Sequence, residues 1–167
     1  MKNLKYELIK VVVGRSVTKF RARALRDFGN LKRGELSGLI SNENCISHLG
    51  NCWVYYDAEM CKNARIFDNA TLQDNAKMFG DSKMYDDAEM HGKAGMHGES
   101  CMYGKSKMFD NSLMYGGSRM YDKSKIFDDA KIYDDARMYG KSKMGDESCM
   151  FGSSKLYKKM ENSKWKT

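Results

Sequence analysis

The chain has 167 residues, and its 31% of charged residues together with a mean hydropathy of -0.69 exclude a membrane span. Its five cysteines are an odd number and include no CxxC pair, which argues against a disulfide framework and a structural zinc site. We therefore expect free thiols, no metal and no cofactor in a protein of single-domain size.

Positive charge is concentrated near the N-terminus. Of the formal net charge of +7, residues 1–51 carry +6 (ten Lys or Arg minus four acids) and residues 52–167 carry +1 (nineteen minus eighteen). Either an anionic partner binds near this end or these residues form a solvated basic cap. The apolar run Leu8–Val13 is broken by Lys10 and precedes no small-residue cleavage site, so we expect no secretory signal and a cytoplasmic location.

The first 51 residues are predicted to form a basic N-terminal cap and an irregular first coil. Tyr6–Val13 and Val17–Phe28 have the composition of two strands, joined by a turn at Gly14 and Arg15. Such a strand pair is long enough to cover the open end of a solenoid, which needs a cap.

A spacing of six residues between apolar positions starts at Ile40 and Ile46. Val54 follows Ile46 by eight residues instead of six. We therefore predict a two-residue bulge at residues 48–50, which joins the irregular first coil to the regular ones.

From residue 52 to residue 157 the chain repeats one six-residue phrase. Every sixth position from Val54 to Leu156 is Val, Met, Ile or Leu, and the residue two positions earlier is always Ala, Ser or Cys. A strict even period is typical of strands, and six-residue repeats are typical of a parallel β-helix with three short strands per 18-residue coil. The sequence thus predicts an all-β fold, a triangular parallel β-helix of about six regular coils with twelve of the fourteen methionines in its core.

The corners of these coils are predicted from the residues after each strand. The first corner position is Gly or Asp in every repeat except at Tyr56, Lys62 and Lys158, and Gly and Asp tolerate the left-handed backbone of a sharp turn. The absence of proline agrees, because interior strands must donate hydrogen bonds to their neighbours. Residues 158–167, with Trp165, break the repeat and are expected to form a C-terminal cap.

The repeat resembles the hexapeptide-repeat superfamily of left-handed β-helix proteins, whose consensus is aliphatic, any, any, any, small, any. The resemblance implies a left-handed coil. Additional segments are similar to the N-terminal module of bacterial and phage hexapeptide proteins labelled as transferases or polymer-forming proteins: Arg23–Phe28, Gly34 with Gly38, Asn44–Ser47, and Gly50–Tyr55.

The resemblance makes acyl transfer one possible activity, because the best-known members are trimeric acyltransferases that use a histidine as general base. Here His91 and His97 are the low-ranking candidates for that base, and both occupy an outward position that is aromatic in most repeats. No residue pattern marks a nucleophile or an orienting carboxylate, so we favour members of an aromatic ladder over catalysts. Paired corner acids such as Asp128 and Asp129 are interpreted as turn residues and not as calcium ligands.

One outer face combines a column of aromatic residues with a column of cations, and the following corner adds lysines. Aromatic rings beside Arg and Lys suit stacking on bases while neutralising phosphates, but a plain stabilising ladder explains the aromatic column equally directly. The candidate anion-binding residues are Arg65, Lys83, Tyr85, Tyr103, Lys105, Arg119, Tyr121, Lys123, Arg137, Tyr139, Lys141 and Lys155.

A second face is less charged and has glycine-rich corners, which permit close approach of another chain. Self-association and an apolar surface without a partner both remain open. The candidate self-association residues are Phe79, His97, Leu113, Tyr115, Tyr133 and Phe151.

The function expected from these observations is that of a non-catalytic bacterial or phage binding protein. Its rigid face of Tyr, Arg and Lys would hold an anionic partner: a nucleic acid, a nucleotide or an acidic protein. If the protein is phage-borne, it would act in the host cytoplasm, where it could block a host defence component. The alternatives are a trimeric acyl-CoA-dependent acyltransferase and a structural protein that polymerises end to end, and homo-oligomers are compatible with all three.

Overall fold

The structure is a computed structural model, and it describes residues 4–13, 17–55 and 57–157. The chain begins with an antiparallel hairpin of β1 (Tyr6–Val13) and β2 (Val17–Ala24), paired from Tyr6 with Ala24 to Val13 with Val17. This confirms the predicted strand pair. The second strand ends at Ala24 and not at Phe28, because the chain turns at residues 28–31. Phe28 and Leu31 exchange backbone hydrogen bonds of 3.2 and 2.9 Å across this turn.

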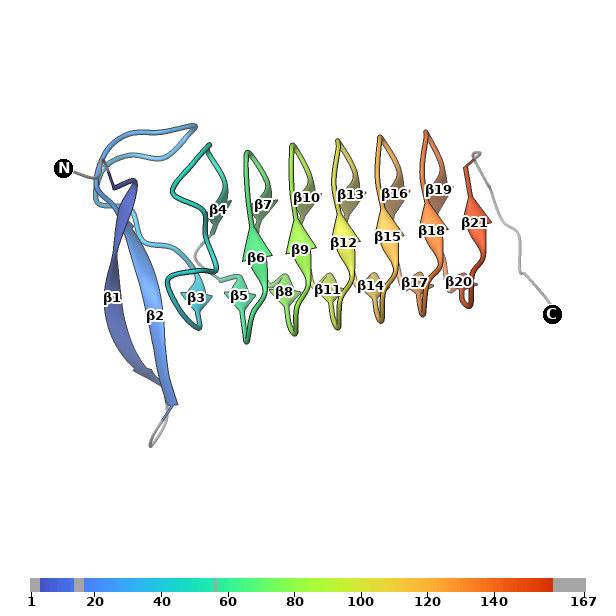
Figure 1. Ribbon diagram of the computed structural model, residues 1–167, viewed down its shortest axis with the longest axis horizontal. Coiled ribbons are helices and arrows are strands. Elements are labelled where there is room, and N and C mark those ends of the chain that lie inside the picture. Colours follow the sequence, from blue (N-terminus) through green and yellow to red (C-terminus); the bar gives the residue numbers. More distant parts are fainter. Residues whose placement is uncertain (1–3, 14–16, 56, 158–167) are drawn as a thin grey trace.

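The rest of the described chain forms a rod with three parallel sheets (Figure 1). Sheet 1 continues from the hairpin through β3 (Leu39–Ile40), β5 (Glu59–Met60), β8 (Lys77–Met78), β11 (Gly95–Met96), β14 (Leu113–Met114), β17 (Lys131–Ile132) and β20 (Cys149–Met150). Sheet 2 contains β4 (Trp53–Val54), β7 (Thr71–Leu72), β10 (Glu89–Met90), β13 (Lys107–Met108), β16 (Lys125–Ile126) and β19 (Lys143–Met144). Sheet 3 contains β6 (Arg65–Ile66), β9 (Lys83–Met84), β12 (Cys101–Met102), β15 (Arg119–Met120), β18 (Arg137–Met138) and β21 (Lys155–Leu156).

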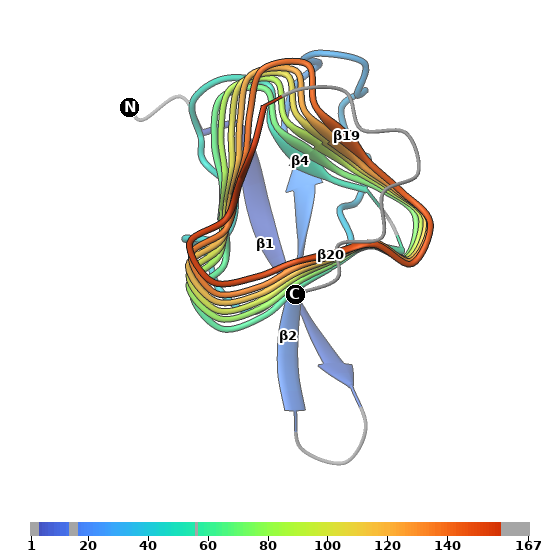
Figure 2. The same ribbon diagram turned by 90° about the vertical axis from the view of Figure 1, so that its right-hand side faces the viewer.

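The three sheets are the sides of a triangle when the rod is seen along its axis (Figure 2). The predicted all-β triangular solenoid of about six coils with an N-terminal hairpin cap is thus confirmed. In Figure 2 the chain runs clockwise from β19 through β20 as it approaches the viewer at its C-terminal end, which is a left-handed coil. Residues 18 positions apart are direct neighbours, for example Met90 and Met108.

The core is the axis of the rod. Each strand turns its second residue inward, and all twelve methionines that occupy these positions are buried, with at most 5% of their surface exposed. The small residues two positions earlier face inward as well; from Ala58 to Ser142 every one of them is buried. The predicted inward columns are therefore confirmed. Methionine is flexible and fills irregular space, which suits an axis where large and small residues alternate.

The corners explain the Gly and Asp pattern. The first corner residue of every turn from Lys62 to Gly152 has a positive φ between 53° and 74°. Seven of these residues are aspartates whose carboxylates accept the backbone N–H of the matching corner one coil later, at 2.9 to 3.3 Å. Aspartate thus tolerates the left-handed backbone, and its carboxylate also accepts a backbone N–H that the hydrogen bonds between coils leave without a partner.

Lys62 is the described corner residue that has neither glycine's freedom nor a short polar side chain, yet its φ is 60°. Because a left-handed residue with a long side chain is disfavoured by roughly 1 kcal/mol, we expect Lys62→Asn to raise the free energy of unfolding by about 0.5–1 kcal/mol in a urea titration. The control is Lys93→Asn, the same change at the second position of a corner, where an effect within about 0.5 kcal/mol is expected. Equal shifts for both variants would contradict the backbone explanation.

The junction between the cap and the regular coils contains the predicted bulge. Ile40 pairs with Met60 and Ile46 with Ile66, both 20 residues apart, whereas Val54 pairs with Leu72 after 18 residues. The two additional residues therefore lie between Ile46 and Val54, as predicted.

Two buried side chains attach the hairpin to this junction: Tyr6, the first residue of β1, and Lys5, the residue before it. The Tyr6 hydroxyl donates to the carbonyl oxygen of Ile46 at 2.6 Å, and its ring stacks on His48 at 4.1 Å. Lys5 is fully buried; its Nζ donates to the carbonyl oxygen of Cys52 at 3.0 Å and lies 3.4 Å from Cys52 Sγ and 5.0 Å from the centre of the Phe28 ring. Burial lowers the pKa of Lys5 and raises that of Tyr6 and of the Cys52 thiol.

Candidate anion-binding face

The outward residues of sheet 3 form a column of cations along the rod, on the strands that face the viewer in Figure 1. Arg65 is paired with Lys83, and Arg119 with Arg137, which is in turn paired with Lys155. Cys101 interrupts the column between Lys83 and Arg119. Burial raises the pKa of the Cys101 thiol, so this position adds no negative charge near neutral pH.

The aromatic column beside these cations is stacked in two segments. Phe67 and Tyr85 stack with ring centroids 4.9 Å apart. The second segment consists of Tyr103, Tyr121, Tyr139 and Tyr157, with successive centroids 5.0, 5.1 and 5.8 Å apart and planes within 20°. We call these four residues the tyrosine ladder. No stacked pair joins Tyr85 to Tyr103 within the described part of the chain, so the predicted column is not continuous.

The ladder restricts what the face can bind. Tyr121 and Tyr139 each have a ring neighbour on both faces, at distances that leave no room for a base between them. What they offer to solvent is ring edges and phenol groups, and burial raises the pKa of Tyr103, which keeps that phenol protonated as a donor. Tyr121 and Tyr139 can therefore contact an anion by hydrogen bonding but cannot stack on its bases.

The corner that follows sheet 3 changes in character along the rod. In its N-terminal half, Asn51, Asn69 and Asp87 are linked by side-chain hydrogen bonds of 3.3 and 3.0 Å. In its C-terminal half the same position is occupied by exposed lysines: Lys105, Lys123 and Lys141. Together with the exposed cations of β15, β18 and β21 they form the basic strip: Lys105, Arg119, Lys123, Arg137, Lys141 and Lys155.

The cations of the basic strip have no ion-pair partner among residues 4–13, 17–55 and 57–157. On the other two sheets, by contrast, Lys107 pairs with Glu89 at 2.6 Å and Lys77 approaches Glu59 at 3.8 Å. Like charges on successive coils repel by an energy of about 1 kcal/mol per pair in water, so an anion bound along the strip would relieve repulsion as well as gain attraction.

The candidate catalytic histidines are both members of aromatic columns. His91 stacks on Phe109 at 5.2 Å, and His97 lies between Phe79 at 5.1 Å and Tyr115 at 4.9 Å. Burial lowers the pKa of His97. The positions match the ladder interpretation, and no carboxylate of the described residues hydrogen-bonds to either ring.

The candidate self-association residues are brought together on sheet 1. Phe79, His97, Tyr115 and Tyr133 form one stack with spacings of 5.1, 4.9 and 5.2 Å, beside Leu113. Phe151 stands at the C-terminal end of this column with 52% of its surface exposed.

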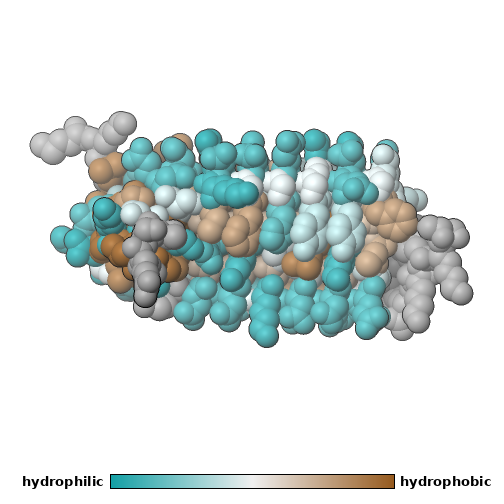
Figure 3. Space-filling model, turned by 90° about the horizontal axis from the view of Figure 1, so that it is seen from below, coloured by the Kyte–Doolittle hydropathy of each residue, from teal (hydrophilic) through white to brown (hydrophobic). Residues whose placement is uncertain are grey.

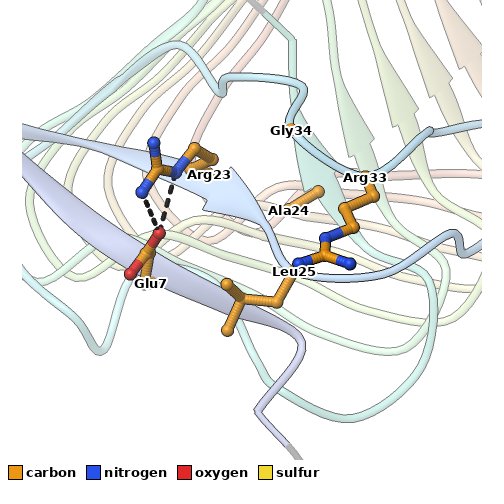
Figure 4. A pocket seen from close by; sticks show the side chains of 6 residues that line it. All are labelled: Glu7, Arg23, Ala24, Leu25, Arg33 and Gly34. Carbon is orange, nitrogen blue, oxygen red and sulfur yellow. Dashed lines mark hydrogen bonds and ion pairs between the residues drawn. The ribbon is translucent and has the colours of Figure 1, made fainter.

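A small pocket at the base of the hairpin was not indicated by the sequence (Figure 4). It has a volume of about 260 Å³ and is lined by Glu7, Arg23, Ala24, Leu25, Arg33 and Gly34. Arg23 donates to Glu7 through Nε at 2.7 Å and also through Nη2, so one of its two arginines is already neutralised. The lining contains no Ser, Thr, Cys, Lys or His.

Comparison with known proteins finds no family model that matches the chain and no curated protein that matches it. Within the described residues no group of three or more His, Cys, Asp or Glu is placed to hold a metal ion. The described residues also contain no helix with the length and apolarity needed to cross a membrane.

Proposed function

We propose that the protein is a non-catalytic binding protein that holds the phosphate backbone of a nucleic acid along the basic strip, by charge and without reading the bases. The observation that carries the proposal is the strip itself: six exposed cations on adjoining coils, with no ion pair among the described residues. A row of uncompensated cations on a rigid support is suited to a linear partner with regularly repeated negative charge.

The tyrosine ladder supports a backbone mode of binding. Phenol and guanidinium groups both donate hydrogen bonds to phosphate oxygens, and Arg119 and Arg137 can each make a two-pronged contact. Because the inner rings of the ladder are stacked on one another, they cannot discriminate bases by stacking. Binding is therefore expected to be insensitive to sequence.

We also propose that the chain is a member of the hexapeptide-repeat superfamily, in the bacterial and phage branch. The proposal is supported by the 18-residue coils, the buried small residue two positions before each buried aliphatic one, and the left-handed turn of the chain.

The test is a fluorescence-anisotropy titration with labelled oligothymidylate and oligodeoxyadenylate of about ten nucleotides, a length within the range of single-strand binding sites. We expect the two probes to bind equally well, and about 10²-fold more weakly at 200 mM than at 50 mM salt, because up to six counterions are released. Polyglutamate serves as the second polyanion. Binding of polyglutamate without binding of either oligonucleotide would overturn the proposal in favour of an acidic protein partner.

A further inference from the structure

Within residues 57–157, the aromatic column of sheet 3 is interrupted once, between Tyr85 after β9 and Tyr103 after β12. The other neighbouring pairs of this column stack with ring centroids 4.9 to 5.8 Å apart. On sheet 1, which Figure 3 shows as a pale and brown band between two rows of hydrophilic side chains, the rings from Phe79 to Tyr133 stack without interruption. We call the interval between Tyr85 and Tyr103 the stacking break.

The stacking break lies in the side chains and not in the backbone. Strand β12 pairs with β9 in the same parallel register as every other neighbouring pair of the regular coils. The N–H of Tyr85 donates to the carbonyl oxygen of Met102 at 3.0 Å, just as the N–H of Tyr103 donates to that of Met120 at 3.0 Å. The two coils are therefore at the ordinary separation of about 4.8 Å, and it is the side-chain rotamers that turn the two rings apart.

A short residue lies beside the stacking break. The outward strand position next to the rings is Arg or Lys on every other regular coil of sheet 3, but it is Cys101 on the coil of Tyr103. Burial raises the pKa of both Tyr85 and Tyr103, and the Cys101 thiol acts on both phenols. No long side chain of the column therefore stands at the break itself, whereas Lys83 and Arg119 stand on either side of it.

The stacking break coincides with the N-terminal end of the basic strip. Lys105 is the first lysine of the corner after sheet 3, and the same position one coil earlier is the exposed Asp87. The adjacent carboxylate of Asp86 accepts the N–H of Gly104 at 2.9 Å. A phosphate backbone that follows the strip would meet these carboxylates beyond Lys105, so we expect it to end or turn away there. The base of its last bound nucleotide then lies beside Tyr103.

We propose that the stacking break holds one base of the bound strand, stacked on the uncovered face of Tyr103 and covered on its other side by Tyr85. This inference rests on the proposed nucleic-acid function and adds to it the place where a base is touched. Every base has a π face, so the contact does not select a sequence. Lys83 and Arg119 can then contact the phosphates next to that base.

The experiment uses oligothymidylate of about four nucleotides, the short end of the range for single-strand binding sites. One thymine is replaced by 2-aminopurine at the 5′ end, in the middle or at the 3′ end, because the fluorescence of this base falls when it stacks on an aromatic ring. With the full chain in excess, we expect the fluorescence to fall about twofold or more for a probe with 2-aminopurine at an end, and less for the middle position.

Two substitutions at one residue separate stacking from other effects. Tyr103→Leu is expected to abolish the quenching and to weaken binding about tenfold. Tyr103→Phe keeps the ring and loses only the hydroxyl, so it is expected to keep the quenching. The matched control is Phe109→Leu, which removes a stacked ring from sheet 2 and is expected to change neither binding nor quenching. Circular dichroism checks that each variant is folded.

Anisotropy of the same probes distinguishes this inference from the proposed function. Binding without quenching at any position, equal quenching at all positions, or quenching that persists in Tyr103→Leu would each refute the stacking site and leave the basic strip as the binding surface. If no probe binds even at low salt, the proposed function fails and the stacking site fails with it.

Discussion

The double variant Arg119→Glu with Arg137→Glu is expected to lose about 10²-fold in affinity for oligothymidylate at low salt. The two arginines are paired neighbours on β15 and β18, at the centre of the basic strip. Reversing both removes two phosphate contacts and places two carboxylates between the remaining lysines. The slope of log affinity against log salt concentration should also become shallower by the contribution of about two phosphate contacts. Anisotropy titrations at several salt concentrations measure this slope.

The matched control for this variant is Lys125→Glu with Lys143→Glu. These lysines are also paired neighbours on adjoining coils, but they lie on β16 and β19 of sheet 2. The change in net charge is identical, so any effect of overall charge appears in both variants. If the two variants lose affinity equally, attraction is general and the strip is not a site; a loss confined to the arginine variant supports the site.

Lys5→Ala is expected to lower the free energy of unfolding by about 3 kcal/mol. Lys5 is fully buried, and its ammonium group donates to the Cys52 carbonyl oxygen while lying against the Phe28 ring. Removing the side chain leaves a buried acceptor without its donor and a cavity beside the aromatic residues of the cap. The measurement is a urea titration, with Lys10→Ala on the adjoining strand β1 as the exposed control, for which a change within about 0.5 kcal/mol is expected.

Lys5 also has a defined effect on the pH dependence of stability. Burial places its folded-state pKa below the ordinary value of 10.5, so the unfolded chain holds the proton more tightly. Raising the pH from neutral toward 10.5 should therefore stabilise the protein relative to Lys5→Met, whose side chain does not titrate. A difference that is constant with pH, or that decreases, would mean that burial does not control this group.

The regular part of the fold was predictable because each of its features repeats. The six-residue spacing of aliphatic and small residues defined the inward columns, and Gly or Asp at each corner defined the turns that have positive φ. The eight-residue interval before Val54 located the bulge. The hairpin was predicted as well, apart from its end: turn formation by Phe28 and Leu31 depends on two residues and has no periodic signal.

The candidate site was predictable in its composition and less so in its chemistry. Which cations share a column follows from the period, and the structure pairs Arg119 with Arg137 as expected. Several features had no sequence signal: the break between Tyr85 and Tyr103, the covered ring faces of the tyrosine ladder, and the buried contact between Lys5 and Cys52. The C-terminal cap predicted for residues 158–167 lies outside the described residues.

The sequence by itself determined the period of this protein, and with it the three sheets, the inward methionines and the members of each outer column, because these depend only on distance along a repeating chain. The tertiary structure alone decided which cations lack a counter-charge, which aromatic ring faces are covered by stacking and where the hairpin projects. Those properties arise from side-chain rotamers and from contacts between the cap and the rod, and no period encodes either.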